Sequence, residues 1–219
     1  MTAGEVPEKP RICRLAVLVS GSGTTLQALL DEILADRLEA EVCVVISSRR
    51  DVAAPDRARR HGVPVHIMRP RDFSTPQEHD SALCSLLQQF RPDLLLLAGY
   101  LSILGESVMK QFGGRIMNIH PSLLPAFGGK GCFGNHVHRQ VLEYGCKVSG
   151  ATVMFVDESV DTGPIILQEA VAVQDDDTVE SLARRVGEVE RRIYPKAVQL
   201  FASGRLSVEG RRVRILTGR

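Results

Sequence analysis

Residues 12–26 read ICRLAVLVSGSGTTL, an apolar segment followed at once by a glycine-containing turn and the start of a helical pattern. The segment 12–19 is short and nearly apolar on both faces, which is typical of a strand covered on both sides of a parallel sheet. Residues 25–38 then repeat Leu and Ile at the i, i+3, i+4 spacing of one helix face. A strand, a tight turn and a helix in this order predict the first half of a βαβ unit.

The same alternation continues along the first half of the chain. Further strands are predicted at 42–46, 63–68, 94–98 and 116–119, and helices at 52–61, 77–90 and 106–112. Strands joined through helices by short connections imply right-handed crossovers and parallel pairing. We therefore predict an α/β fold with an open, mostly parallel, doubly wound sheet of the Rossmann-like type and helices on both of its faces.

The pattern changes after residue 145. The predicted elements are strands at 148–156 and 165–173, a long helix at 178–202 and a hairpin at 206–216. Thr178 is a suitable N-cap for the long helix. We divide the chain into a flexible N-terminus at 1–11, one domain at 12–204 and a C-terminal hairpin or tail at 205–219.

The composition is that of an ordinary globular protein. The 219 residues carry 27 Lys and Arg against 26 Asp and Glu, a net charge of +1 that disfavours a general nucleic-acid partner. The longest apolar run, 94–104, is far shorter than the roughly 18 residues of a membrane span. The chain start has no signal-peptide core, and the five cysteines are scattered as in reduced proteins. We predict a cytoplasmic protein with no nucleic-acid, membrane or metal partner.

The turn Ser20-Gly21-Ser22-Gly23 ends where the first helix is predicted to begin. Glycines let backbone N–H groups approach an anion closely, and the helix dipole adds a partial positive charge. A dinucleotide fingerprint does not fit because its third glycine position is Leu26, and no Gly-Lys-Ser/Thr sequence of a P-loop occurs. The turn predicts either a seat for the phosphate of a small substrate or a tight turn without a ligand.

Asn118 and His120 are the most informative pair in the sequence. They alternate with Met117 and Ile119 in a predicted strand, so both polar side chains are expected on one face at its carboxyl end. Open α/β sheets bind ligands at this end of their strands. An amide can stabilise the oxyanion of an attacked carbonyl and an imidazole can move protons, which suits acyl-type transfer. A hydrogen-bonded strand end without a catalytic role is the alternative.

The acidic loop 157–164 supplies a third candidate. A carboxylate beside a catalytic imidazole stabilises the charged ring, and Asp161 is best placed because the turn 163–164 (Gly-Pro) fixes it. A solvated acidic turn is the alternative. The spacing of His136 and His138 could suit a metal, but no third ligand is evident, so we expect loop or surface histidines.

Together these stretches resemble the phosphoribosylglycinamide formyltransferases, folate-dependent enzymes of purine synthesis. The matching segments lie within about residues 12–206 and are VSGSGT at 19–24, LAGYL at 97–101, NIHPSLLP at 118–125, VDTGPIILQ at 160–168 and IYP at 193–195. The string NIHPSLLP followed by the Asp-x-Gly-Pro turn is the most specific part. The resemblance implies a formyltransferase-like fold, 10-formyltetrahydrofolate as co-substrate, small-molecule partners, and a monomer or homodimer without a metal.

The resemblance also implies a role for each matching residue. Asn118 would hold the oxyanion, His120 would transfer the proton and Asp161 would stabilise the charged imidazole. The residues implied to bind phosphoribosylglycinamide are Gly23, Thr24, Thr25 and, on the ribose side, Glu190. The residues implied to bind the folate are Leu101, Ser102, Ile103, Leu104, Asn118, Asp157, Glu158, Ser159, Val160 and Asp161.

Four departures from the family pattern bear on these roles. Thr25 stands where many members have Asn, and its hydroxyl can still donate to a phosphate. Ser102 and Pro76 each stand where an Arg is usual, which removes charged contacts expected for the glutamate tail of the folate. The loop 128–135 is longer than in the family and holds four glycines, which predicts a flexible lid.

Three other functions fit parts of the pattern. A formyltetrahydrofolate hydrolase shares the catalytic domain but gives the formyl group to water, and its N-terminal regulatory domain would not fit before residue 12. A methionyl-tRNA formyltransferase would need a C-terminal nucleic-acid-binding domain, for which residues 205–219 are too few. A non-catalytic nucleotide-binding module on the same sheet would not need Asn118, His120 and Asp161 together.

Overall fold

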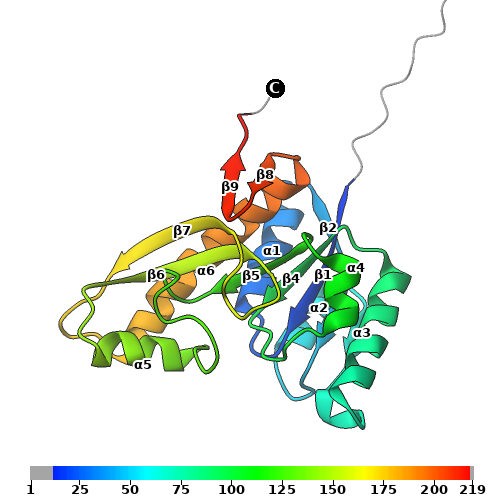
Figure 1. Ribbon diagram of the computed structural model, residues 1–219, viewed down its shortest axis with the longest axis horizontal. Coiled ribbons are helices and arrows are strands. Elements are labelled where there is room, and N and C mark those ends of the chain that lie inside the picture. Colours follow the sequence, from blue (N-terminus) through cyan, green and yellow to red (C-terminus); the bar gives the residue numbers. More distant parts are fainter. Residues whose placement is uncertain (1–11, 218–219) are drawn as a thin grey trace, which may run out of the picture.

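The computed structural model describes residues 12–217, which form a nine-stranded sheet in the order β3-β2-β1-β4-β5-β6-β7-β9-β8 (Figure 1). The strands are β1 Cys13–Val19, β2 Ala40–Ser47, β3 Val65–Ile67, β4 Leu94–Ala98, β5 Ile116–His120, β6 Val148–Phe155, β7 Ile165–Ala172, β8 Leu206–Glu209 and β9 Arg212–Ile215. Strands β1 to β5 pair in parallel, whereas β6 pairs antiparallel with β5 and with β7. The predicted open, mostly parallel sheet is confirmed.

Helices cover both faces of the sheet, as predicted. They are α1 Thr24–Leu34, α2 Ala54–Arg60, α3 Pro76–Phe90, α4 Glu106–Phe112, α5 Asn135–Glu143 and α6 Val179–Ala202, with a short 3-10 helix at Pro70–Asp72. Buried side chains of α1, α2, α5 and α6 belong to one hydrophobic cluster, and those of α3 and α4 to a second cluster on the other face. Alternate residues of each central strand pack into the two clusters, which explains why these strands are apolar on both faces.

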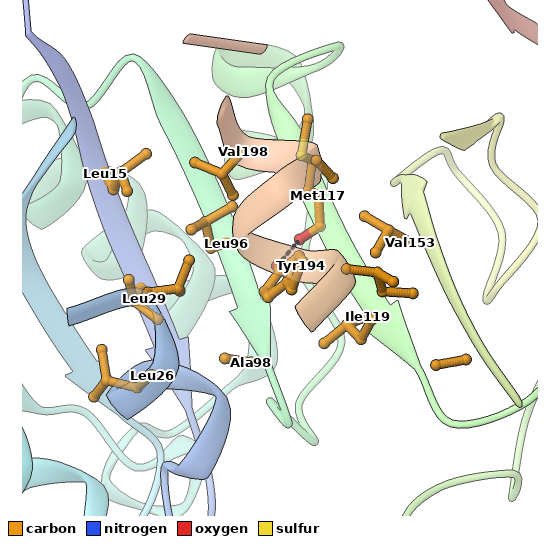
Figure 2. Packing of buried hydrophobic residues seen from close by; sticks show 14 of the residues in the cluster. Leu15, Leu26, Leu29, Leu96, Ala98, Met117, Ile119, Val153, Tyr194 and Val198 are labelled. Atoms are coloured by element: carbon orange, nitrogen blue, oxygen red, sulfur yellow. Dashed lines mark hydrogen bonds between the residues drawn. The ribbon is translucent and has the colours of Figure 1, made fainter. Parts of the chain in front are cut away.

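The long helix α6 is attached to the centre of the sheet through Tyr194. The hydroxyl of this fully buried side chain shares its one hydrogen between the carbonyl oxygens of Leu97 at 3.1 Å and Met117 at 3.0 Å. Figure 2 shows the Tyr194 ring among side chains of β4, β5 and β6. Burial raises the pKa of this hydroxyl well above its usual range, so the hydroxyl stays protonated and keeps donating. The helix is therefore fixed against the central strands β4 and β5.

The order of the strands reverses at β1, with β2 and β3 on one side and β4 and β5 on the other. At such a switch point the loops after neighbouring strands separate and leave a crevice for a ligand. The hydroxyl Oγ of Ser20, directly after β1, accepts a hydrogen bond at 2.9 Å from the backbone N–H of Leu101, which follows β4. The glycine turn and the loop after β4 are thus joined at this edge of the sheet.

Most predicted elements are present within a few residues of their predicted bounds. The capping box of α6 is formed, because Thr178 Oγ1 accepts from Ser181 N at 3.2 Å and Ser181 Oγ accepts from Thr178 N at 2.9 Å. Helix α5 was not predicted, and the assignment of residues 1–11 as a flexible N-terminus lies outside the described residues. Within 12–217, none of the helices has the length and apolar character needed to cross a bilayer.

Candidate active site

Asn118 and His120 lie on the same face at the end of β5, as their alternation predicted. Both meet Asp161, from the loop between β6 and β7. The Asn118 amide Nδ2 donates to Asp161 Oδ1 at 3.4 Å, and His120 Nδ1 lies 3.4 Å from Asp161 Oδ2. The side chains of His120 and Asp161 are only 4% and 8% exposed. The fold therefore brings the three predicted catalytic residues together, with His120 and Asp161 largely buried.

Asp161 is fixed by its own backbone and by a neighbouring loop. Its φ of 57° is in the left-handed region, which is uncommon for a non-glycine residue. The backbone N–H of Gly129 donates to Asp161 Oδ2 at 3.0 Å. Gly163 allows the close return of the loop, since a Cβ there would overlap the carbonyl oxygen of Phe155. The carboxylate is thus positioned by the fold itself.

The ring of His120 is also held at its other nitrogen. Nε2 lies 2.8 Å from the carbonyl oxygen of Phe127. The segment between them is anchored in turn, because Ser122 Oγ donates to Ala126 O and Thr152 Oγ1 donates to Ser122 O, each at 2.6 Å. The carbonyl oxygen of Phe127 can only accept, so Nε2 donates to it and Nδ1 is the ring nitrogen that faces Asp161. A fixed ring orientation is what directed proton transfer requires.

A second imidazole lies close to the site and was assigned wrongly from the sequence. His138 belongs to α5 and is 4% exposed, because the neighbouring Val137 and Val141 pack into the core. Burial, and to a smaller extent the charge of His120, lowers the pKa of His138 to about 4. The prediction of a loop or surface histidine is therefore wrong for His138, while His136 is exposed but helical.

A cavity of about 350 Å³ opens beside the three residues. Its lining contains Asn118, His120 and all of the residues that were predicted to bind the folate. These are Leu101, Ser102, Ile103, Leu104, Asn118, Asp157, Glu158, Ser159, Val160 and Asp161. The loop 157–161 is ordered by Asp157, whose Oδ1 accepts from Thr162 Oγ1 at 2.7 Å and from Ser159 N at 3.2 Å. We call the lining of this cavity the cavity side of the site.

The predicted phosphate turn does not line the cavity. We call residues 20–25 together with Glu190 the turn side. Gly23 is the N-cap of α1 with φ 73°, and no side chain caps the first turn of this helix. A Cβ at Gly23 would overlap Ala54 of α2, so the turn needs glycine for both its conformation and its packing. The first N–H groups of α1 are consequently left for a ligand or water.

Two charged side chains bear on the turn side, Arg57 through a contact with the turn and Glu190 as a residue predicted to bind the same substrate. Arg57, which the sequence analysis missed, donates from Nε to the carbonyl oxygen of Ser22 at 2.8 Å and brings a positive charge to the turn. Glu190 of α6 is half-buried, and burial raises its pKa to about 7 against a smaller opposing effect of Arg191. Glu190 also lies close enough to Tyr194 for its charge to raise the pKa of that hydroxyl further.

Comparison with known proteins identifies the family. The family model described as "Formyl transferase" matches residues 13–198, most of the chain. The chain belongs to the formyl transferase family. The phosphoribosylglycinamide formyltransferase of Escherichia coli is 36% identical over 194 residues, which cover 89% of each chain. The formyl transferase resemblance noted in the sequence is therefore confirmed.

Two further relatives extend the formyl transferase comparison. The crystal structure of glycinamide ribonucleotide transformylase 1 from Symbiobacterium toebii superposes with a TM-score of 0.92 at 48% identity, covering 99% of this chain and 100% of that one. The trifunctional purine biosynthetic protein adenosine-3 of Bos taurus is 42% identical over 205 residues, 93% of this chain. This chain spans only 20% of that trifunctional protein's length.

Proposed function

We propose that this formyl transferase moves the formyl group of 10-formyltetrahydrofolate to the primary amine of phosphoribosylglycinamide. The observation that carries the proposal is the convergence of Asn118, His120 and Asp161 beside a cavity in a chain of this family. An amide donor, an imidazole and a carboxylate are the groups that an attack on a carbonyl carbon needs. The products are the N-formylated amine and tetrahydrofolate.

The reaction is a direct transfer in one active site. The amine nitrogen bonds to the formyl carbon, and the bond from that carbon to the folate nitrogen N10 breaks. Asn118 donates to the formyl oxygen while it carries negative charge. His120 carries the proton that the amine loses toward the departing N10, and Asp161 stabilises the ring while it is charged.

The two sides of the site divide the two substrates in this proposal. The cavity side takes the folate, because its apolar lining and half-enclosed shape suit a large ring system. The turn side takes phosphoribosylglycinamide, with its phosphate at the N–H groups of Gly23, Thr24 and Thr25 and its ribose near Glu190. The free N-terminus of α1 and the charge of Arg57 support a phosphate at this place.

The deciding experiment follows the release of tetrahydrofolate from 10-formyltetrahydrofolate with and without phosphoribosylglycinamide. We expect release to depend on the amine, and the formylated amine to accumulate in equal amount. Release that is independent of the amine would instead identify a hydrolase. No release and no product under either condition would refute both activities and favour a module that only binds nucleotides.

A further inference from the structure

The loop 128–134 between β5 and α5 contributes one charged side chain to the cavity. Lys130 is the single Lys or Arg among the described residues that line it, whereas Asp157, Glu158 and Asp161 are acidic. Lys130 is exposed and has no carboxylate within ion-pair distance among residues 12–217. A cation that lines a cavity without a protein partner is available to a negatively charged ligand.

The position of Lys130 is set by a tight turn. The backbone N–H of Cys132 donates to the carbonyl oxygen of Gly129 at 3.0 Å, and Gly131 has φ 90°. This bond and this φ describe a β-turn with glycine at its third position and Lys130 at its second. Gly129 is bonded in turn to Asp161 Oδ2 at 3.0 Å. Lys130 is therefore one residue from a backbone group that is attached to the predicted catalytic carboxylate.

Several apolar side chains that line the cavity are unusually exposed to solvent, and we call them the apolar rim. Leu101, Ile103, Phe133 and Val160 all line the cavity and are 46%, 79%, 46% and 44% exposed. Such a group of exposed apolar side chains indicates a ligand with an apolar body. A ligand that has both an apolar body and a negative charge would pack against the rim and pair with Lys130.

We propose that Lys130 binds a carboxylate of the glutamate tail of the folate and so sets the preference for glutamylated folates. This inference rests on the proposed function, because it assigns the folate to the cavity side. A reduced folate combines an aromatic benzoyl group with a glutamate that bears two carboxylates, which matches the rim and the single cation. The phosphate of the second substrate is the less suitable partner, since none of residues 23–25 lines the cavity.

The experiment compares two ligands and three proteins. The ligands are 10-formyltetrahydrofolate and its diamide, in which both glutamate carboxylates are carboxamides and carry no charge; the proteins are the unaltered chain, Lys130→Ala and Lys147→Ala. Lys147 is the matched control, an exposed lysine whose ion pair with Asp175 at 2.6 Å lies outside the cavity lining. We expect Lys130→Ala to raise the KM and Kd for the folate about 2- to 5-fold, the size of an exposed ion pair. Its effect on the KM and Kd for the diamide should be nil, and Lys147→Ala should change these values for neither ligand.

Further variants and salt sharpen the result. Lys130→Arg should retain the preference for the folate over the diamide, Lys130→Glu should reverse it, and the Lys130→Ala effect should shrink at high salt. Equal loss for both ligands, or no loss for either, would overturn the inference while leaving formyl transfer intact. Conversely, glutamate-dependent folate binding through Lys130 without any formyl transfer would refute the proposed function and support the inference. Failure of the unaltered chain to bind tetrahydrofolate would overturn both.

Discussion

The cavity side and the turn side lie at the same edge of the sheet but are built in opposite ways. On the cavity side the three predicted catalytic groups are already paired, with Asp161 bound to Asn118, His120 and the N–H of Gly129. On the turn side no side chain caps α1, and Glu190 makes no hydrogen bond or ion pair with another described residue. The three predicted catalytic groups are paired without a ligand, whereas the turn side has groups that only a ligand or water can satisfy.

This difference predicts which kinetic constant each side controls. Groups held in place before binding can act on the developing charge of the reaction without reorganising, so their loss should lower kcat. Groups that are satisfied only when substrate is present contribute binding energy, so their loss should raise KM. The substitutions below test this division, beginning with the largest effect.

The strongest test removes the preorganised groups one at a time. Asn118→Ala, His120→Ala and Asp161→Ala should each lower kcat for formyl transfer by at least ~10²-fold, because each removes a donor, a proton carrier or the charge that stabilises it. Steady-state kinetics with both substrates measures the effect, and circular dichroism checks the fold. Near-normal turnover in two of the three variants would discard the mechanism.

A second test uses the burial of Glu190. Its pKa is raised to about 7 from 4.5, so the folded chain keeps a proton that the unfolded chain has already lost. The free energy of unfolding should therefore be unaffected by the ionisation of Glu190 below pH 4.5. It should fall as the pH rises from 4.5 toward 7, and this loss should stay constant at higher pH. Glu190→Gln should remove this fall and make the chain about 1–2 kcal/mol more stable at pH 8, with no gain at pH 4.

Chemical denaturation at pH 4, 6 and 8 measures the difference. Glu188→Gln is the matched control, since Glu188 is an exposed carboxylate on the same helix. An equal change in both variants, or a gain for Glu190→Gln that does not depend on pH, would show that Glu190 is not held protonated by burial. Glu190→Gln should also weaken the binding of phosphoribosylglycinamide if Glu190 contacts the ribose.

The cavity side was the easier side to predict from the sequence. Asn118 and His120 follow from the two-residue period of a strand, and their place at its carboxyl end follows from the fold class. Asp161 was marked by the Gly-Pro turn after it, and the left-handed backbone at Asp161 agrees with a tightly held loop. These signals are local, so a single sequence contains them.

The features that the sequence did not reveal depend on contacts between distant elements. Helix α5 is short and follows a glycine-rich loop, and its apolar pair Val137 and Val141 was the available signal. The burial of His138 depends on how α5 packs against α6, and the place of Arg57 depends on the contact between α2 and the glycine turn. No pattern in the local sequence around His138 or Arg57 indicates these contacts.

The finest test separates the two sides by substrate. Thr25 is buried at the start of α1, and Val keeps its shape while removing the hydroxyl that can donate to a phosphate. Thr25→Val should raise the KM for phosphoribosylglycinamide about 5-fold, the size of one modest hydrogen bond, and change the KM for 10-formyltetrahydrofolate less than 2-fold. Thr25→Ser, which keeps the hydroxyl, is the control and should lie close to the unaltered chain. Equal effects of Thr25→Val on both substrates would mean that the turn supports the whole site rather than one phosphate, and the division between the two sides would have to be abandoned.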